Sequence, residues 1–278
     1  MILTVDIGNT SIHLGLFERG KLRKQVSLPT HVARSQTELT RWFRRVAPSP
    51  EPRAPSQAII CSVVPWATPA MARALRAAGV GQVRVVGKDL KVPLKNRYRY
   101  PRQVGQDRLV GAYAAWSEFG DGALRRRAAG RSPERARKRE SRGCIVCDFG
   151  TAITIDVVTK AGEYLGGVIA PGLEISLEAL ASRTALLPKV ELKEPPELLG
   201  RDTANSIRSG ILYGSAALCD GLTARLKRQY APKAVVVATG GASPLIAKQA
   251  RTIDHLRPNL VLEGLLLLAH GRGITEAR

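Results

Sequence analysis

Long apolar runs are missing from this chain of 278 residues. The longest candidate, residues 260–269, is interrupted by Glu263 and has about half the length of a membrane-spanning helix. We therefore expect no membrane span. The sequence passes from Met1 directly into a strand-like run, without the charged and apolar regions typical of a signal peptide, and we expect a cytoplasmic location.

Cysteine is scarce, which excludes a disulfide scaffold. The four cysteines are Cys61, Cys144, Cys147 and Cys219. Cys144 and Cys147 have the Cys-x-x-Cys spacing, but a second pair that would complete a zinc site is absent. We predict that they are buried core thiols, because free cysteine is usually interior.

Acidic residues are also few, with 23 Asp and Glu against 43 Lys and Arg and a formal net charge of +20. Such an excess suggests nucleic acid or another polyanion as a partner. Residues 124–142 carry nine Lys or Arg against two Glu, a difference of +7, without any aromatic residue for base stacking. We predict a solvated basic insertion over 119–143, with non-specific contact to a polyanion as the alternative.

Two familiar nucleotide motifs are absent, the Walker loop and the glycine fingerprint of dinucleotide-binding folds. Residues 2–12 instead form an apolar strand that ends at Asp6 and turns through Gly8, Asn9 and Thr10. Gly8 allows the backbone to approach an anion closely, and the Asp6 carboxylate suits Mg²⁺, directly or through water. The alternative is an ordinary hairpin turn.

A second copy of this pattern lies at residues 144–158. Another apolar strand ends at Asp148, turns at Gly150 and continues through Thr151. Two such elements, about half a chain apart, predict two similar half-sites that face one another across a cleft. Each turn would then hold one end of a polyphosphate.

A third polar stretch precedes a helix predicted over 109–116. Gly105, Asp107 and Arg108 lie at or near its N-terminus, where the helix dipole favours negative charge. One interpretation is a helix cap with a surface ion pair. The other is that Asp107 accepts a hydroxyl proton while Arg108 neutralises a phosphate or carboxylate.

Strands and helices alternate along the rest of the chain. A helix is predicted over 35–46, where Ser35 and Glu38 have capping-box spacing, followed by a strand at 58–64 and a helix at about 68–78. A later helix over 205–230 is rich in small residues, which favours close packing with another helix or subunit. This alternation predicts a layered α/β fold.

Eight motifs in order resemble those of the type III pantothenate kinases, a family of the sugar kinase, actin and Hsp70 ATPase superfamily. The motifs lie at 6–11, 98–108, 148–156, 166–172, 187–190, 200–210, 238–241 and 262–265. The resemblance covers nearly everything except the insertion. It implies an α/β fold of two ribonuclease H-like (actin-like ATPase) domains, with mixed sheets flanked by helices and an active-site cleft between them. We place these domains at 1–118 and 144–278.

The resemblance also implies a reaction. Similar enzymes transfer the γ-phosphoryl group of ATP to pantothenate, giving 4'-phosphopantothenate in the first step of coenzyme A biosynthesis. They act as homodimers with Mg²⁺ and a monovalent cation, K⁺ or NH₄⁺. The alternatives are a non-catalytic, nucleotide-binding regulatory protein that contacts nucleic acid, and another small-molecule kinase of the superfamily.

Site residues carry over by position. Asp107 would be the general base, and Asp148 would bind the monovalent cation, while Asp6 would hold Mg²⁺ through the phosphates. The residues expected to bind pantothenate are Tyr98, Gly105, Gln106, Asp107, Arg108 and, from the neighbouring subunit, Thr203. The residues expected to bind ATP are Asp6, Ile7, Gly8, Asn9, Thr10, Ser11, Ile12, His13 and Thr151. Two features depart from the family: Gln106, where members often have alanine, and the length of the basic segment 121–143.

Overall fold

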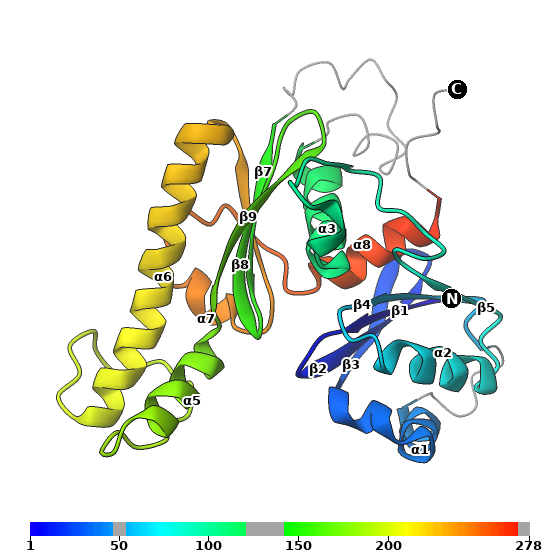
Figure 1. Ribbon diagram of the computed structural model, residues 1–278, viewed down its shortest axis with the longest axis horizontal. Coiled ribbons are helices and arrows are strands. Elements are labelled where there is room, and N and C mark those ends of the chain that lie inside the picture. Colours follow the sequence, from blue (N-terminus) through cyan, green and yellow to red (C-terminus); the bar gives the residue numbers. More distant parts are fainter. Residues whose placement is uncertain (47–53, 121–141, 272–278) are drawn as a thin grey trace. The chain divides into compact units, whose positions relative to one another are not determined.

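The computed structural model describes residues 1–46, 54–120 and 142–271 (Figure 1). The chain divides into two compact units. Unit 1 comprises Met1–Leu94, Tyr100–Ala114 and the segment from Val261, and unit 2 comprises Lys95–Arg99 and Ala115–Leu260. The units therefore do not follow the order of the chain. Residues 95–99 lie between two segments of unit 1 but belong to unit 2, and the last helix follows unit 2 but belongs to unit 1. Most of the predicted insertion 119–143, with its predicted polyanion contact, lies outside the described residues.

Unit 1 is a mixed sheet with the strand order β3-β2-β1-β4-β5. Its first three strands form an antiparallel meander, and β4 and β5 continue the sheet in parallel. The strands are β1 (Ile2–Ile7), β2 (Ser11–Glu18), β3 (Lys21–Pro29), β4 (Gln57–Ser62) and β5 (Gln82–Val85). The helices are η1 (Thr30–Arg34), α1 (Gln36–Val46), α2 (Ala67–Ala77), η2 (Pro101–Gln103), α3 (Gln106–Ala115) and α8 (Leu260–Ala269).

The predicted start of α1 is confirmed. The Ser35 hydroxyl accepts a hydrogen bond from the Glu38 amide at 3.2 Å, which satisfies one of the amides that the first helical turn leaves without an intrahelical partner. Such a cap typically stabilises a helix by about 1 kcal/mol.

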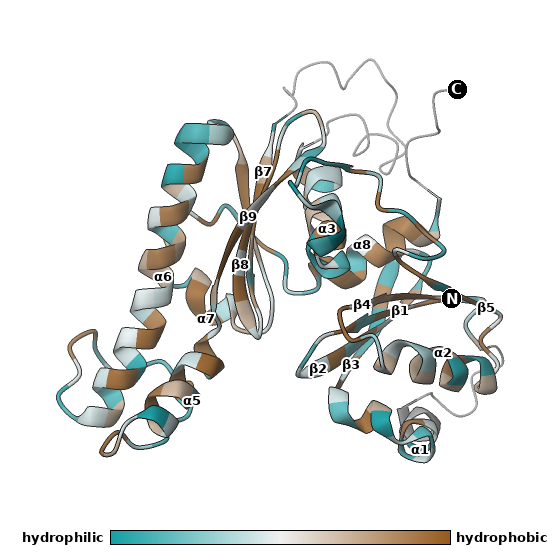
Figure 2. Cartoon of the chain, viewed as in Figure 1, coloured by the Kyte–Doolittle hydropathy of each residue, from teal (hydrophilic) through white to brown (hydrophobic). Residues whose placement is uncertain are grey.

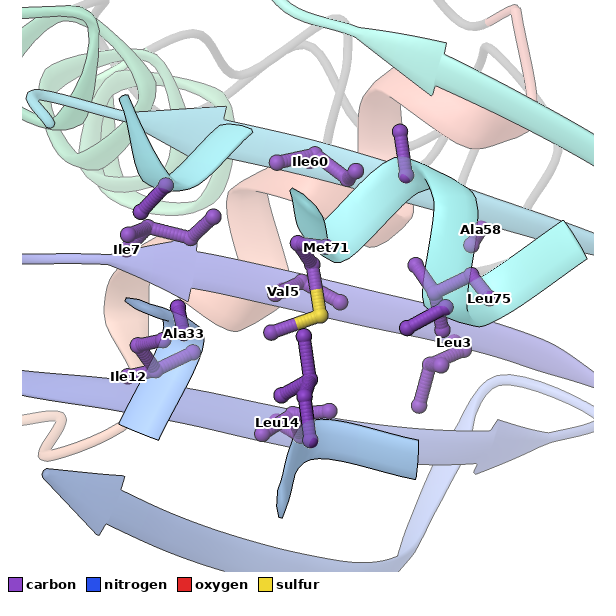
Figure 3. Close-up of a cluster of buried hydrophobic side chains, with 14 of the residues drawn as sticks. Leu3, Val5, Ile7, Ile12, Leu14, Ala33, Ala58, Ile60, Met71 and Leu75 are labelled. Carbon is purple, nitrogen blue, oxygen red and sulfur yellow. The ribbon is translucent and has the colours of Figure 1, made fainter. Parts of the chain in front are cut away.

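Successive side chains of β1 point to opposite faces of the unit 1 sheet, and the two faces differ in what packs on them. Leu3, Val5 and Ile7 are buried in one core cluster with Met71 and Leu75 of α2 (Figure 3). On the other face, Phe17 packs against α8, which is mostly brown in Figure 2. The two faces of a strand alternate by residue, so Asp6 points away from the α2 core.

Helices α3 and α8 pack tightly within unit 1. A Cβ added at Gly264 of α8 would lie only 2.6 Å from the Val110 carbonyl oxygen of α3. Glycine at this position therefore allows the two helix backbones to approach. The contact fixes the orientation of α3, whose first turn carries Asp107.

Unit 2 repeats the connectivity of unit 1. Its sheet has the order β11-β10-β7-β8-β9-β6, again with a three-strand meander followed by parallel strands. The strands are β6 (Lys95–Asn96), β7 (Cys144–Phe149), β8 (Ala152–Val158), β9 (Glu163–Pro171), β10 (Val235–Thr239) and β11 (His255–Leu256). The helices are η3 (Trp116–Gly120), α5 (Leu173–Arg183), α6 (Thr203–Tyr230) and α7 (Ser243–Ala247). The predicted fold class, two α/β domains with mixed sheets flanked by helices, is confirmed.

The unit 2 core contains part of the cysteine pattern. All four cysteines are free and buried, which confirms the prediction that Cys144 and Cys147 are core thiols. Cys147 lies 3.7 Å from Cys219 of α6, sulfur to sulfur, in the cluster formed by β7 and α6. Cys144, three residues earlier on the strand, projects from the opposite face, so this pair is unsuited to a shared metal. Burial raises the pKa of the Cys144 thiol. In the described part of the chain, every helix is too short or too polar to cross a membrane.

Candidate functional site

The first Asp-x-Gly turn connects β1 to β2. The Gly8 amide donates to the Ser11 carbonyl at 3.0 Å, which closes the turn and leaves Asn9 and Thr10 exposed at its tip. Ile7 and Ile12 on either side are fully buried in the core. Of the residues predicted to bind ATP, these two can therefore offer a ligand only their backbone.

Strand register places Asp6 in a row of polar side chains. Asp6 is paired with His13 on β2 and with Cys61 on β4. Paired residues on neighbouring strands project from the same face of a sheet, here the face opposite the α2 core.

Asp107 reaches the same place from α3. Burial raises the pKa of the Cys61 thiol, and the negative charges of Asp6 and Asp107 raise it further. Both carboxylates therefore lie near one buried sulfur. Geometry agrees: a Cβ at Gly105, two residues before Asp107, would lie 3.4 Å from the Val63 side chain, and the Val63 amide donates to the Ile7 carbonyl at 3.1 Å, next to Asp6.

His13 is held from both sides by serine. Its Nε2 lies 2.9 Å from Ser11 Oγ, and its Nδ1 lies 2.7 Å from Ser27 Oγ on β3. Burial lowers the pKa of His13, since the charged imidazolium loses hydration there. The neutral ring can donate with one nitrogen and accept with the other, so both hydroxyls can be satisfied.

This lowered pKa predicts a pH-dependent stability. The contribution of neutral His13 is fully present above the ordinary pKa of 6.5 and is lost as pH falls through the lowered value of the folded state. We expect the free energy of unfolding to fall more steeply below pH 6.5 in the wild type than in His13→Gln. Urea unfolding between pH 5 and 8 measures both curves. Parallel curves, or an NMR titration of His13 with a pKa above 6.5, would contradict the prediction.

The first turn of α3 depends on Gly105. Any side chain at this position would collide with Asp107 Oδ1, which also accepts a hydrogen bond from the Arg108 amide at 2.7 Å. The carboxylate thus lies over the helix N-terminus, where negative charge is favoured. Gln106, the departure from the family pattern, packs against Gly87, where a Cβ would lie 3.1 Å from its side-chain carbon.

The second Asp-x-Gly turn, in unit 2, is also closed by the amide of its glycine, but it is one residue shorter. The Gly150 amide donates to the carbonyl two residues later, that of Ala152, at 3.2 Å, whereas the Gly8 amide donates to the carbonyl three residues later, that of Ser11. Thr151 is exposed, and its carbonyl accepts from the Gly172 amide at 3.2 Å. The di-glycine turn after β10 packs against it: Gly240 has φ of +89°, and a Cβ there would collide with Asp148 Oδ1.

Tyr98 and Thr203 occupy other parts of unit 2. A Cβ at Gly166 of β9 would lie 2.8 Å from the Tyr98 ring, so glycine makes room for this aromatic side chain. The register sets Gly166 three residues and two strands away from Asp148, a separation of roughly 14 Å. Thr203 is exposed at the first residue of α6. The structure therefore does not bring Tyr98 to the Asp148 turn.

Three residues that border these turns were not among the predicted site residues. Thr30 donates to the first turn, Cys61 is paired with Asp6 in the sheet, and Gly240 packs against Asp148. Only Gly240 carried a local signal, as part of a di-glycine turn. Within the described ranges, groups of three or more His, Cys, Asp or Glu that could hold a metal ion are absent, so a cation at Asp148 would need other oxygen ligands as well.

Comparison with known proteins assigns this arrangement to a family. The family model for type III pantothenate kinase matches residues 2–124 and 134–225, well over half of the chain. The chain belongs to the type III pantothenate kinase family. The resemblance carried by the eight motifs is thereby confirmed, and with it the enzyme class, a kinase that uses ATP.

Relatives match along nearly the whole length. Type III pantothenate kinase 1 of Symbiobacterium thermophilum is 39% identical over 275 residues, with 96% of each chain covered. Type III pantothenate kinase of Anaeromyxobacter dehalogenans is 37% identical over 270 residues, covering 96% of this chain and 98% of the relative. A Baf family protein from Campylobacter jejuni of known structure has the same fold, with a TM-score of 0.54, 15% identity and 97% of both chains covered.

Proposed function

We propose that this chain transfers the γ-phosphoryl group of ATP to the terminal hydroxyl of pantothenate, the first step of coenzyme A biosynthesis. One observation carries the proposal: the start of α3, which holds Asp107, packs against Val63, and the Val63 amide donates to the Ile7 carbonyl beside the phosphate-type turn at 3.1 Å. A nucleotide turn and a candidate base are thus held on one side of a single sheet. Membership of the family supports pantothenate as the acceptor.

The turn after β1 is the proposed phosphate contact. Gly8 gives the backbone close access to an anion, and the exposed Asn9 and Thr10 offer polar groups at the tip. The half-buried Asp6 carboxylate is the kind of oxygen ligand that Mg²⁺ prefers, either directly or through water. When bound with ATP, Mg²⁺ would neutralise charge on the phosphates.

Asp107 is the proposed general base. The pantothenate hydroxyl oxygen bonds to the γ-phosphorus while the bond between that phosphorus and the ADP oxygen breaks, and Asp107 takes the hydroxyl proton. Arg108 neutralises charge nearby, and Gly105, Gln106 and Tyr98 are proposed to contact pantothenate. Most of the catalysis then comes from positioning and charge neutralisation.

Asp148 is the proposed ligand of a monovalent cation, K⁺ or NH₄⁺, with Thr151 contacting ATP. A cation beside this carboxylate would offset its repulsion of the incoming phosphate. The close approach of Gly240 supports the proposal. Position 240 has no room for a side chain, so backbone rather than another side chain borders the Asp148 carboxylate there.

A homodimer formed through α6 is part of the proposal. Exposed small residues recur along this helix at a spacing of three or four, which places them on one face: Ser206, Gly210, Gly214, Ala217 and Gly221. A Cβ at any of the three glycines would meet nothing within 4 Å. Such a face suits close packing of a second helix, and Thr203 begins the same helix.

The dimer makes a measurable prediction. Gly214→Leu adds a bulky side chain where the isolated chain has open space, so we expect a folded monomer instead of a dimer in analytical ultracentrifugation. Gln229→Leu, in the exposed last turn of α6, is the matched control and should remain dimeric. A dimeric Gly214→Leu would exclude this face as the interface.

The activity is tested by ADP release. The purified chain is incubated with ATP and Mg²⁺ and a panel of hydroxyl acceptors, with and without K⁺, and ADP is measured by a coupled assay. We expect release that depends on pantothenate and is stimulated by K⁺. Release with another acceptor alone would reassign the substrate. A flat response accompanied by salt-sensitive DNA binding would favour the regulatory alternative.

A further inference from the structure

We propose that Thr30 is a positioning residue that braces the nucleotide turn from outside the motif. The inference rests on the proposed function, in which the turn from Gly8 to Thr10 contacts ATP phosphates. Thr30 lies twenty residues beyond this turn and outside every motif that indicated the function.

Two hydrogen bonds connect Thr30 to the turn. Its hydroxyl donates to the Gly8 carbonyl at 2.7 Å, and its amide donates to the Thr10 carbonyl at 2.9 Å. The β2–β3 register, which pairs Ser11 with Pro29, brings the start of η1 against the turn. One residue thus holds the carbonyls on both sides of Asn9.

The two bonds affect what the turn presents to a ligand. A carbonyl oxygen that rotates toward a phosphate repels it, whereas a backbone N–H attracts it. Thr30 binds the carbonyls of Gly8 and Thr10, and Val63 binds that of Ile7 at 3.1 Å. With these three carbonyls held by the protein, the turn is pre-organised for an anion.

Thr30 is buried, so its hydroxyl bonds to the protein rather than to water. The residue is only 2% exposed, beside Leu28 and Ala33, which are buried as well. A buried hydroxyl must form a hydrogen bond within the protein, and this one bonds to Gly8. Removing it would also leave the Gly8 carbonyl without this donor.

The test compares variants that keep or remove the hydroxyl. Thr30→Val and Thr30→Ala remove it, and Thr30→Ser keeps it. Affinity for a non-hydrolysable ATP analogue is measured by calorimetry without pantothenate, followed by steady-state kinetics. We expect about tenfold weaker nucleotide binding for Val and Ala, equivalent to about 1.4 kcal/mol, and near wild-type binding for Ser.

Kinetics separate positioning from general damage. We expect the KM for ATP to rise about tenfold in the two hydroxyl-free variants while the KM for pantothenate and kcat change less than about twofold. The matched control is Thr4→Val, which removes a fully buried hydroxyl that donates to the Gly15 carbonyl at 3.3 Å in the same meander. It should lose stability but retain nucleotide affinity.

Each other outcome overturns the proposal. Equal losses in Thr30→Ser and Thr30→Val, wild-type affinity in Thr30→Val, or equal affinity losses in Thr4→Val would each show that the hydroxyl does not position nucleotide. Unfolded Val and Ala variants would make Thr30 a purely structural residue. A failure of the proposed function looks different. If pantothenate is not the acceptor, the wild type releases no ADP with pantothenate, but Thr30→Val and Thr30→Ala still bind the ATP analogue more weakly than the wild type and Thr30→Ser.

Discussion

The Asp107→Asn variant is expected to keep its fold and to lose about 10²- to 10⁴-fold in kcat, the usual span for a missing general base. Asparagine preserves the size of the side chain and can still accept a hydrogen bond from the Arg108 amide through its carbonyl oxygen. It cannot take the hydroxyl proton. The KM for ATP should change little, because the proposed phosphate contacts lie on the β1 turn.

Steady-state ADP release and the midpoint of thermal unfolding are the measurements. Asp89→Asn is a matched control in the same unit, since Asp89 is exposed and accepts a hydrogen bond from a backbone amide, that of Val85. It should retain kcat. A near-normal kcat in Asp107→Asn would refute the assignment of the base.

Gly240→Ala is expected to have the largest effect in unit 2. Alanine at φ of +89° is strained, and its methyl group would collide with Asp148 Oδ1 and lie 2.7 Å from the Phe149 carbonyl. Strain and overpacking together should lower the free energy of unfolding by about 2 to 4 kcal/mol. Because the Asp148 carboxylate must move, activation by K⁺ should be lost as well.

Its neighbour provides the control. A Cβ at Gly241 meets nothing within 4 Å, so Gly241→Ala should change neither stability nor the response to K⁺. Urea unfolding and a K⁺ titration of ADP release measure the two effects separately. If Gly240→Ala is destabilised but keeps its K⁺ activation, Asp148 is not the cation ligand.

Local chemistry made parts of the fold predictable. The Asp-x-Gly turns, the Ser35 cap and the start of α3 each depend on residues within a few positions of one another, and the structure contains all of them. The two Asp-x-Gly turns also indicated two similar domains, because an apolar strand of the same pattern leads to Asp6 and to Asp148.

The remaining features depend on long-range register. Thr30 contacts Gly8 because the register of β2 and β3 pairs Ser11 with Pro29. Gly240 contacts Asp148 because β10 lies beside β7, with Thr239 paired to Asp148. The short strands β6 and β11, two residues each, have too little pattern to be recognised. Nor could composition reveal that α8 belongs to unit 1.

The membership of α8 in unit 1 has a consequence for biosynthesis on the ribosome. Phe17 and its neighbours on one face of the first sheet are covered by Leu262 and Leu266, which are synthesised about 240 residues later. At about 5 to 20 residues per second, the nascent sheet keeps this apolar face exposed for roughly 10 to 50 s. Unit 1 thus begins to emerge before unit 2 yet is completed after it, and during that interval its apolar face is open to aggregation or to a chaperone.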